Sequence, residues 1–564
     1  MNHPKLQPTR RSVLTGIGAA AIAAVSPAQS VSIAGPRSNT FFEIQRLPDI
    51  VRAFTESSQP IVLQRSGTSL TWSGNGIDLS FGMTADTLVP TLAASSTAVT
   101  RIHLRWTLPV ASTLQLLGDA WERSYGDMGW MPIIPERPMP WYFLAHDGRA
   151  THAYGVLTGA AAFAFWQCDR DGVSLWLDVR NGGKGVLLGQ RTLQLAIIVT
   201  QQGSPDVKPF AAAQNFCKML CSSPRLPATP IYGSNDWYYA YGQSSADDIL
   251  RDAELMAELA PSSGPRPFTV IDEGWEHSPK FPSMPGLAAQ IKSHGVRPGI
   301  WVRPLRAIGE TNTSLLLPAA RFGSDSSQNH SWDPTIPEAR AKALKTISDP
   351  VSWNYEMIKH DFTTFDLLGQ WGFQMGASPS LSGWSFHDRS RTNAEIIRDL
   401  YQDIRRAAGP SAVITGCNVV GHLSAGLFEA QRTGDDVSGK IWERTRRMGV
   451  NTLAFRLPQH NTFFVMDPDC IPVTAAIPWS LTKMWMDAVA ATGAALILSP
   501  VAGSLDAEKK SAVREAFAIS AAGGVNAQPE DWLISRTPAQ WKDSHGGTNT
   551  CNWLQPEGAW PFEA

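Results

Sequence analysis

The stretch Phe268-Thr269-Val270-Ile271-Asp272-Glu273-Gly274-Trp275 shows the pattern that decides the fold. Its first half is a short apolar run typical of a buried strand, and two acidic residues and a tryptophan follow within four positions. In a sheet of parallel strands, the residues directly after a strand lie at its carboxyl end, where such proteins place their functional groups. The same pattern elsewhere in the chain therefore bears on both fold and function.

Further apolar runs of similar length lie between residues 230 and 500. They are Ile231–Gly233, Pro298–Val302, Met357–Lys359, Ala412–Thr415, Leu427–Ala430, Thr452–Phe455 and Ala495–Leu498. Amphipathic helical patterns lie between several of them, as at 246–259 and 394–408, and another follows the last run at 506–520. These strand–helix units predict a (β/α)8 barrel. A doubly wound open sheet is the alternative, but the number of parallel units favours closure.

The sequence on either side of this region has a different character. Residues 37–225 contain short alternating stretches, such as Ser174–Val179, and turn signals such as Asn75-Gly76. This pattern predicts an antiparallel β-sandwich. Residues 226–521 are assigned to the barrel, and 522–564 to a short C-terminal segment. The predicted fold class is multidomain β plus α/β: an N-terminal β-sandwich, a central TIM barrel and a β-rich C-terminal tail.

Polar and aromatic residues occupy nearly every predicted strand end, although a purely structural barrel needs none there. In chain order they are Asp236, Trp237, Asp272, Glu273, Trp301, Lys359, Asp361, Cys417, Asn418, Arg432, Asp435 and Asp436. Barrel enzymes take their catalytic groups from these ends. The sequence shows no zinc-ligand spacing, phosphate loop or dinucleotide fingerprint, so we expect neither a metal nor a cofactor.

Several of these segments resemble one family, in the family's order. Val270–Trp275 is similar to the DDGW segment of the α-galactosidase and raffinose-synthase-like glycosidases, and Ile358–Asp361 resembles their K-x-D nucleophile motif. Arg432–Asp436 resembles their acid/base motif. Weaker similarity extends to Trp332–Glu338, Met466–Asp469 and Thr492–Ser499. The resemblance covers the barrel region, and it implies a retaining glycosidase with a β-sandwich ahead of the barrel in one branch of the family.

The chemistry implied by this resemblance requires two carboxyl groups, about 5–5.5 Å apart, on either side of the anomeric carbon. Asp361 is the expected nucleophile, and Lys359, two residues earlier, is expected to keep its carboxylate ionised. Aligning the family's T-S-D form on the sequence favours Asp435 as the acid/base. Counting four residues on from Arg432 favours Asp436. We expect Asp435 and keep Asp436 as the alternative.

The other strand-end residues are expected to bind the sugar. They are Asp236, Trp237, Asp272, Glu273, Trp301, Lys359, Cys417, Asn418 and Arg432. The two tryptophans would form stacking walls. Glu273 departs from the family's usual aspartate, and its extra methylene would place the carboxylate near C6 of galactose. That position would favour L-arabinopyranose, which lacks the hydroxymethyl group; the alternative is that the carboxylate reaches a different hydroxyl of the sugar.

The leading functional expectation is hydrolysis of terminal α-D-galactosides with retention. The alternatives within the class are β-L-arabinopyranosidase activity and galactosyl transglycosylation. A non-catalytic carbohydrate-binding protein is the alternative from another class. The presence of Asp361 together with Asp435 and Asp436 argues against it.

Composition excludes some partners. The 564 residues include 48 Lys and Arg against 50 Asp and Glu, a net charge of -2, which gives no electrostatic reason to expect nucleic acid or an acidic membrane. The expected partner is an oligosaccharide or glycan. No stretch beyond the N-terminus reaches ~18 apolar residues, so no stable membrane span is expected. The six cysteines lack metal spacing and are expected to be small buried side chains.

The N-terminus has the parts of an export signal. Thr9-Arg10-Arg11-Ser12-Val13-Leu14 precedes a short apolar run, Gly16–Val25, and then Ser26-Pro27-Ala28. This order matches a twin-arginine signal over residues 1–28. The predicted location is therefore periplasmic or secreted.

Overall fold

The computed structural model describes residues 40–57, 59–276, 278–323 and 330–559. The predicted export signal lies outside these residues, so the signal and the extracytoplasmic location stay predictions. In the described part of the chain, none of the helices combines the length and apolar character needed to cross a bilayer.

The N-terminal region is built of antiparallel strands, as the alternating pattern predicts. They are β1 (Ile50–Phe54), β2 (Ile61–Val62), β3 (Gln64–Arg65), β4 (Thr71–Gly74), β5 (Ile77–Met83), β6 (Thr87–Ala93), β7 (Arg101–Thr107), β8 (Gln115–Gly118), β9 (Met139–Pro140), β10 (Tyr142–His146), β11 (Thr151–Val156), β12 (Phe163–Asp169), β13 (Gly172–Asp178), β14 (Thr192–Gln194) and β15 (Ile198–Gln201). One sheet has the order β2-β1-β7-β13-β12-β9, and the other has the order β3-β4-β5-β6-β15-β11-β10-β8, with β14 paired to β6. Side chains of both sheets lie fully buried in the core, among them Trp106 and Trp166 of the first sheet and Phe143 and Tyr154 of the second.

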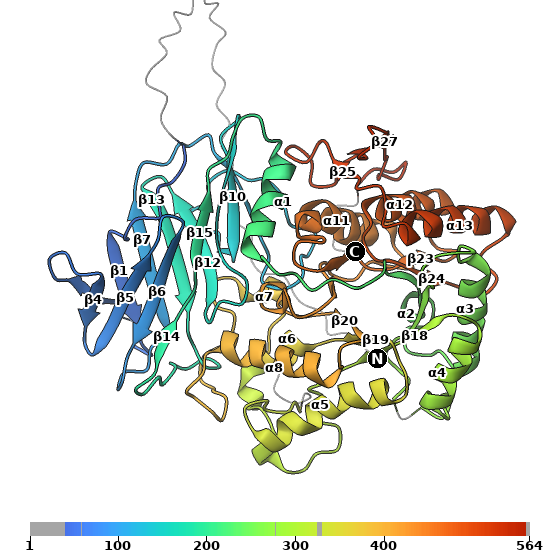
Figure 1. Cartoon of the computed structure of the whole chain (residues 1–564), viewed down its shortest axis with the longest axis horizontal. Helices are drawn as coiled ribbons and strands as arrows, with labels where there is room; N and C mark the ends of the chain where they lie inside the picture. The colour runs from blue at the N-terminus through green and yellow to red at the C-terminus, as the bar shows by residue number, and fades with distance from the viewer. Residues whose placement is uncertain (1–39, 58, 277, 324–329, 560–564) are drawn as a thin grey trace, which may run out of the picture. The chain divides into compact units, whose positions relative to one another are not determined.

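The central region is a parallel sheet with helices outside it (Figure 1). Its strands are β16 (Tyr232–Asn235), β17 (Phe268–Ile271), β18 (Arg297–Val302), β19 (Met357–His360), β20 (Val413–Gly416), β21 (Ala430–Arg432), β22 (Val465–Asp467), β23 (Ile471–Val473) and β24 (Leu496–Pro500). The order is β22-β21-β20-β19-β18-β17-β16-β24-β23, without the reversal that defines a doubly wound sheet. The Ala495 N–H donates to the Met466 carbonyl at 2.9 Å and links β24 back to β22. The sheet therefore curls until its two ends meet.

One predicted strand is wrong. Thr452–Phe455 lies in helix α11 (Asn451–Arg456), where every residue is buried. A short apolar run fits a buried helix as well as a buried strand, so its composition alone does not decide between them. The seventh position of the sheet is filled instead by β22 and β23, on either side of a break at Pro468–Cys470. The predicted sixth strand also starts late, at Ala430.

Helices lie between or after the strands, and most of them cover the outer face of the parallel sheet. They are α1 (Pro209–Leu220), α2 (Trp237–Ala240), α3 (Ala246–Leu259), α4 (Met284–Ser293), α5 (Pro337–Ser352), α6 (Thr363–Leu368), α7 (Gly372–Met375), α8 (Asn393–Ala407), α9 (Gly421–Ser424), α10 (Trp442–Arg444), α12 (Trp479–Thr492) and α13 (Ala507–Ala521). Ser245 and Thr392 cap α3 and α8 with reciprocal side-chain bonds to Asp248 and Glu395. Single-turn or π-helical pieces lie at Thr313–Leu315, Ala319–Phe322, Thr445–Val450 and Leu457–Gln459.

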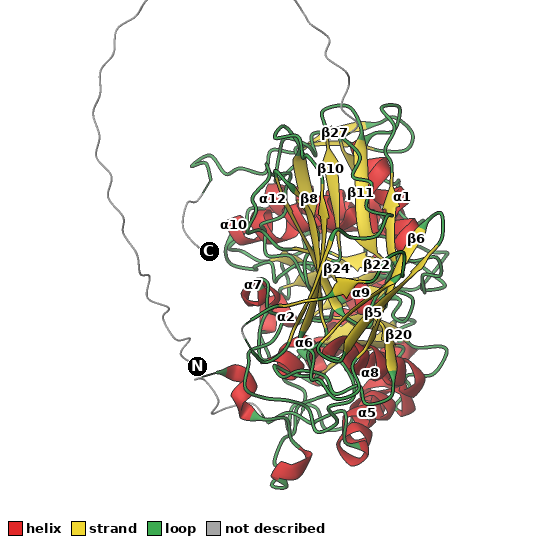
Figure 2. Cartoon of the chain, turned by 90° about the vertical axis from the view of Figure 1, so that its left-hand side faces the viewer, coloured by secondary structure: helices red, strands yellow, loops and turns green. Residues whose placement is uncertain are grey.

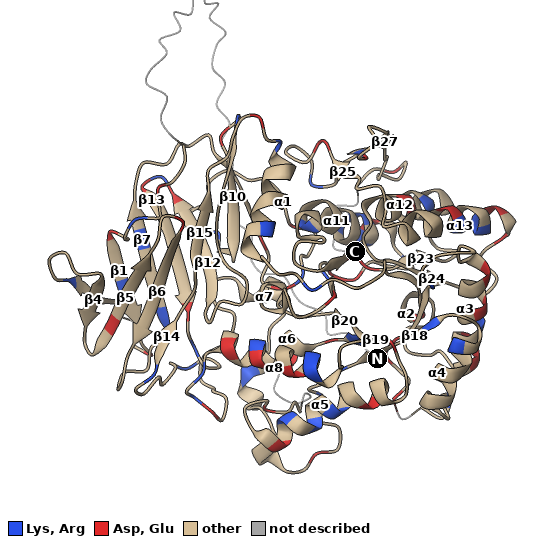
Figure 3. Cartoon of the chain, viewed as in Figure 1, with Lys and Arg blue, Asp and Glu red and all other residues tan. Residues whose placement is uncertain are grey.

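The C-terminal segment carries a small antiparallel sheet of β25 (Gln528–Pro529), β26 (Gln540–Lys542) and β27 (Thr548–Thr550). Figure 2 shows the strands β8, β10 and β11 in the upper part of the view and the helices α5 and α8 near its lower end. Both basic and acidic residues lie on α3, α5, α8 and α13, in keeping with the near-zero net charge of the chain (Figure 3). All six cysteines are buried.

Candidate active site

A cavity of about 480 Å³ opens at the carboxyl ends of the parallel strands. It is lined by Arg123, Trp237, Asp272, Glu273, Trp301, Lys359, Asp361, Phe362, Trp371, Cys417, Arg432 and Asp436. Most of the residues that the sequence placed at strand ends therefore meet in one place. Asp236, Asn418 and Asp435 are not among its lining residues.

Asp361 follows strand β19 directly and points a carboxylate into this cavity. Trp301 Nε1 donates to Asp361 Oδ2 at 3.1 Å, and the Phe362 N–H donates to Oδ1 at 2.7 Å. Phe362 has a left-handed backbone, φ 61°, which turns the chain sharply after the acid. Two donors and a fixed turn hold this carboxylate in one orientation.

Lys359 does not pair with Asp361 as the sequence predicted. Its ammonium lies 2.6 Å from Asp272 Oδ2, which also accepts from Asn235 Nδ2 at 2.7 Å. Burial alone would lower the pKa of Lys359, but the Asp272 carboxylate raises it well above its ordinary value. The lysine side chain is long enough to cross the sheet interior and reach Asp272 at the end of β17. Asp361 lies one residue beyond the end of β19, outside the sheet interior that Lys359 enters. The nucleophile candidate thus takes its donors from Trp301 and Phe362.

Asp236 does not line the cavity, but it holds Asp272, which does. Asp236 is buried, its Oδ1 accepts the Asp272 N–H at 2.7 Å, and Ser244 donates to its other oxygen. Burial, followed by the charge of Asp272, raises the pKa of Asp236 to about 6. The sequence-based assignment of Asp236 to sugar binding is therefore not supported by its position, because its carboxylate is occupied in holding Asp272.

Asp435 and Asp436 differ in their surroundings. Asp436 lines the cavity and its side chain is 42% exposed. Its Oδ1 lies 3.0 Å from Arg432 and 3.4 Å from Arg123. Although burial acts to raise the pKa of Asp436, these two guanidinium groups hold it at about 2. Asp435 is only 18% exposed and pairs with Arg444 at 2.8 Å and with Arg123 at 3.4 Å.

Glu273 lines the cavity at the end of β17. Its carboxylate lies 3.6 Å from the Arg306 guanidinium. Burial raises the pKa of Glu273, and Arg306 opposes this shift. Trp237 and Trp301 also line the cavity, as predicted, and Trp301 is at the same time fully buried.

Cys417 and Asn418 have separate roles in the structure. Cys417 lines the cavity and its sulfur lies 3.9 Å from Arg432 Nη1. Asn418 is fully buried, donates to Glu122 and accepts the Phe365 N–H at 3.1 Å. Its predicted contact with sugar is therefore not supported, because its amide bonds the N-terminal region instead.

Three residues that line the cavity, Arg123, Phe362 and Trp371, were not predicted from the sequence. Arg123 comes from the loop between β8 and β9 of the sandwich, and its guanidinium carbon lies 5.6 Å from the Trp371 ring centre. The adjoining Ser124 N–H donates to the Thr433 carbonyl, and the Asp435 N–H donates to the Ser124 carbonyl, both at 2.9 Å. A local sequence pattern gives no sign of this contact, since it depends on how the sandwich packs on the barrel.

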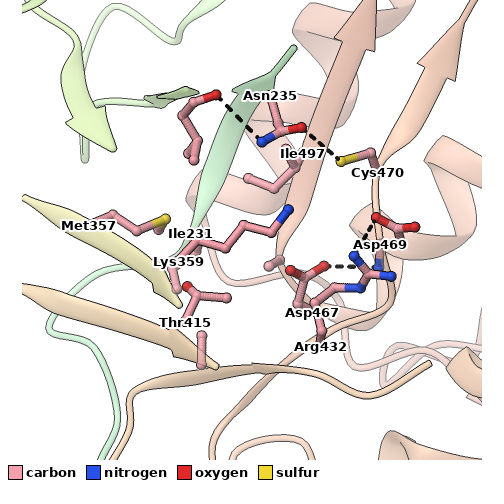
Figure 4. Close-up of a pocket in the computed structure, with 13 residues that line it drawn as sticks. Ile231, Asn235, Met357, Lys359, Thr415, Arg432, Asp467, Asp469, Cys470 and Ile497 are labelled. Atoms are coloured by element: carbon pink, nitrogen blue, oxygen red, sulfur yellow. Dashed lines mark hydrogen bonds and ion pairs between the residues drawn. The ribbon is translucent and has the colours of Figure 1, made fainter. Parts of the chain in front are cut away.

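Beneath the cavity the sheet interior holds further polar side chains (Figure 4). Lys359 and Arg432 reach into it from β19 and β21, the strands on either side of β20. Arg432 Nη1 lies 3.0 Å from Asp469 Oδ1, and the Cys470 thiol donates to Asn235 Oδ1 at 3.9 Å. The two cations at the floor of the cavity thus have fixed carboxylate partners.

Among the described residues, no group of three or more His, Cys, Asp and Glu side chains is placed to hold a metal ion. Three histidines of the barrel region, His360, His422 and His460, are buried. Burial lowers the pKa of His360 and of His422 to about 3 and that of His460 to about 4, so all three are neutral.

Comparison with known proteins gives a structural match without a sequence match. No family model and no curated protein matches the chain. An α-galactosidase from Thermus thermophilus, solved with p-nitrophenyl α-D-galactopyranoside, aligns with a TM-score of 0.59 over 88% of this chain and 98% of its own, at 15% identity. A variant of the GH36 α-galactosidase AgaA from Geobacillus stearothermophilus, solved with 1-deoxygalactonojirimycin, aligns with a TM-score of 0.57 over 86% of this chain and 73% of its own, at 12% identity.

The chain shares its fold with these α-galactosidases. A third match, the galactosidase domain of an α-galactosidase–sucrose kinase, agrees with this, with a TM-score of 0.52 over 90% of this chain and 75% of that chain, at 12% identity. The antiparallel sheets ahead of a curled parallel sheet are thus a shared architecture. At these identities the likeness concerns the fold, and the chemistry depends on the cavity itself.

Proposed function

We propose that the protein is a retaining glycosidase that releases terminal α-D-galactosyl residues. The observation that carries the proposal is that Asp361 and Asp436 line one cavity at the carboxyl ends of strands β19 and β21. These two strands lie on either side of β20, and a double displacement requires two carboxyl groups that face one site in this way. The solved structures of similar fold are α-galactosidases, one of them holding stachyose.

Asp361 acts as the nucleophile in this proposal. Its carboxylate attacks the anomeric carbon while the bond to the leaving oxygen breaks, which forms a glycosyl ester. The Trp301 and Phe362 donors keep the attacking group in place. Ordered donors reduce the reorganisation needed to reach the transition state.

Asp436, and not Asp435, acts as the acid/base. It protonates the leaving oxygen in the first step, then takes a proton from the water that attacks the ester and frees Asp361. Asp436 lines the cavity with the nucleophile, whereas Asp435 is paired with Arg444 and Arg123. The remaining polar lining, Asp272 with Lys359 at the floor, is proposed to bind sugar hydroxyls.

The test is an Asp361→Gly variant assayed with an aryl α-galactoside. Removing the nucleophile should lower kcat on the order of a thousandfold or more, and added azide should restore turnover with a glycosyl azide of inverted configuration. Circular dichroism checks that the variant is folded. Activity near that of the unchanged protein, or the absence of any azide product, would remove Asp361 from this role.

A second candidate, β-L-arabinopyranosidase activity, is favoured by one observation. Glu273 lines the cavity, where its carboxylate is held near Arg306. A longer acid than aspartate takes space from the substituent at C5 of the sugar. The ratio of kcat/KM for aryl β-L-arabinopyranoside and aryl α-galactoside decides between the two sugars.

A further inference from the structure

A separate cavity of about 1040 Å³ lies on the β-sandwich. Its walls come from strands β1, β7, β12 and β13 of the first sheet, from the loops next to them, and from the barrel residues Ala377 and Ser378. It shares no lining residue with the catalytic cavity. The proposed reaction therefore makes no use of this space or of its side chains.

The cavity lies on the face of the first sheet that is turned away from the core. Successive side chains of a strand point to opposite faces. In β12, Trp166 packs against Phe143 of the other sheet, with ring centres 5.7 Å apart, so Phe165 and Gln167 face outward. Trp176 of β13 is paired directly with Phe165 and shares this outward face. These outward aromatic rings are not part of the packing between the two sheets.

The aromatic side chains form an ordered wall across neighbouring strands. The Trp176 indole lies between His103 and Phe165, with ring centres 4.1 Å and 6.0 Å apart and ring planes within 18° and 8° of parallel. Phe54 is tilted against the same indole at 5.5 Å, and Trp176 Nε1 donates to Gln167 Oε1 at 2.8 Å. Trp176 and Phe54 are only partly buried. A ligand that packs on such a wall does not have to order it first.

Arg101 and Glu56 supply a donor and an acceptor beside these rings. Arg101 Nε donates to Asp178 at 3.2 Å and its Nη2 donates to Ser378 Oγ at 3.1 Å, whereas no described residue accepts from its Nη1. Glu56 is 53% exposed and its Oε1 accepts from Arg389 at 3.3 Å, whereas no described residue donates to its Oε2. Both side chains thus have hydrogen-bonding capacity left for a ligand.

These walls define the chemistry of the ligand. Asp178 offsets the charge of Arg101 and Arg389 offsets that of Glu56, so the site favours a neutral molecule. A purely apolar ligand would cover both polar groups without replacing their bonds to water. A saccharide meets each requirement, because its apolar ring face packs on aromatic rings while its hydroxyls accept from Arg101 and donate to Glu56.

We propose that this cavity is a non-catalytic binding site for a neutral saccharide chain. Phe54 and Trp176 form its stacking surface, and Arg101 and Glu56 bind the hydroxyls. The site holds one part of a glycan while the catalytic cavity acts on a terminal residue, which raises the effective concentration of chain ends at the reacting carboxylates. The inference goes beyond the proposed function and rests on it only for the choice of a galactose-bearing probe.

Affinity electrophoresis through gels that contain galactomannan, a neutral polysaccharide with α-galactosyl branches, measures this binding. Every protein tested carries Asp361→Gly, so that the polymer is not cleaved. Adding Trp176→Ala or Glu56→Ala should raise the Kd for the polymer about threefold to tenfold. Trp479→Ala and Glu43→Ala are the matched controls, because Trp479 is partly buried, Glu43 is exposed and neither lines the cavity. The controls should leave the Kd unchanged.

The same substitutions with Asp361 restored give a second measurement, kcat/KM for an aryl α-galactoside. Trp176→Ala and Glu56→Ala should leave it unchanged, because a small substrate does not reach the sandwich cavity. If Trp176→Ala lowers it through misfolding, which circular dichroism detects, the exposed position Glu56 decides the result.

An unchanged Kd for galactomannan in both Trp176→Ala and Glu56→Ala would overturn the inference. So would a rise in Kd that the two control substitutions reproduce. Failure of the proposed function looks different: the unchanged protein would not hydrolyse the aryl α-galactoside, while its retardation by galactomannan would still depend on Trp176 and Glu56.

Discussion

Asp435 and Asp436 are neighbours in the chain and both lie 3.4 Å from Arg123, yet their other partners differ. Asp435 is paired with Arg444, whereas Asp436 is paired with Arg432 and opens to the cavity. We expect Asp436→Ala to lower kcat/KM by about 10²–10⁴-fold on disaccharides, whose leaving groups need protonation. Activated aryl galactosides should lose far less. Steady-state kinetics on leaving groups of graded acidity measures this difference.

Asp435→Ala is the matched variant for this comparison. It should show similar losses on all leaving groups, because Asp435 holds two guanidinium groups and does not face substrate. If Asp435→Ala gives the leaving-group dependence and Asp436→Ala does not, the roles are exchanged.

Arg123 should set the upper pH limit of activity. Together with Arg432 it holds the pKa of Asp436 at about 2 when no substrate is bound, which favours the ionised form that acts as the base in the second step and opposes the acid step. The acid step needs this carboxyl protonated, so kcat should fall as pH rises above the pKa that Asp436 has with substrate bound. Arg123→Met removes one cation, raises the pKa of Asp436 and moves the basic limb of the kcat profile to higher pH, by about one unit.

A conservative substitution provides the control for this pH effect. Arg123→Lys keeps the positive charge and should keep the basic limb within a few tenths of a unit. A limb that stays fixed in Arg123→Met would show that Arg123 does not act on the acid/base.

At the scale of single residues, the sequence predicted where the candidate residues lie along the strands better than it predicted which side chains they contact. Asp361 at the end of a strand follows from an apolar run and the acid behind it. The pairing of Lys359 with Asp272 does not, because it joins two strands 87 residues apart. The choice between Asp435 and Asp436 also depends on tertiary contacts, namely those of Arg123.

At the scale of elements, most parallel strands were predictable, because they are short, apolar and followed by polar residues. The seventh was not, since it is divided into β22 and β23. Neither piece is long enough to stand out from its surroundings. Asp469, with φ 85° at the break, and Thr452–Phe455, in a buried helix, show two ways in which tertiary structure overrides a local pattern.

Gly233 in strand β16 is the element-scale test. It pairs with Phe268 of β17, its φ is 151°, and a Cβ there would lie 1.9 Å from the Phe268 carbonyl oxygen. We expect Gly233→Ala to lower the free energy of unfolding by more than about 3 kcal/mol. Urea unfolding followed by tryptophan fluorescence measures this loss.

The same substitution at Gly82 in β5 is the control. A Cβ at Gly82 meets Val89 at 3.7 Å, an ordinary contact, so the change should stay under about 1 kcal/mol. Equal effects at the two glycines would contradict the assignment of a steric cause at Gly233.

At the scale of the whole molecule, the sandwich and the barrel share one compact unit, Thr40–Ala564. Glu122 joins them: it is fully buried and accepts from the Gly372 N–H at 2.7 Å and from Asn418. Arg456 also donates to the Glu122 carbonyl at 3.0 Å. The sequence predicted the two regions separately, but nothing in either pattern could reveal the bonds between them.

We therefore expect sandwich and barrel to unfold in one transition. Glu122→Gln replaces one acceptor oxygen with an NH2 group, so a buried donor loses its acceptor. The free energy of unfolding for the single transition should fall by about 1–3 kcal/mol. Scanning calorimetry measures whether the whole unfolding transition shifts to a lower temperature. Glu254→Gln on the exposed face of α3 is the control and should have no measurable effect. Two separate transitions, only one of them shifted, would show that the regions unfold independently.

The loop that holds Glu122 and Arg123 limits how this protein can be recombined with its structural relatives. A chimera that joins this barrel to a sandwich from another enzyme would lose the arginine beside Asp436 and the carboxylate that Asn418 bonds. Such a graft would need to carry residues 121–125 with the barrel. The fold alone makes the two regions look like exchangeable modules, but the catalytic centre is divided between them.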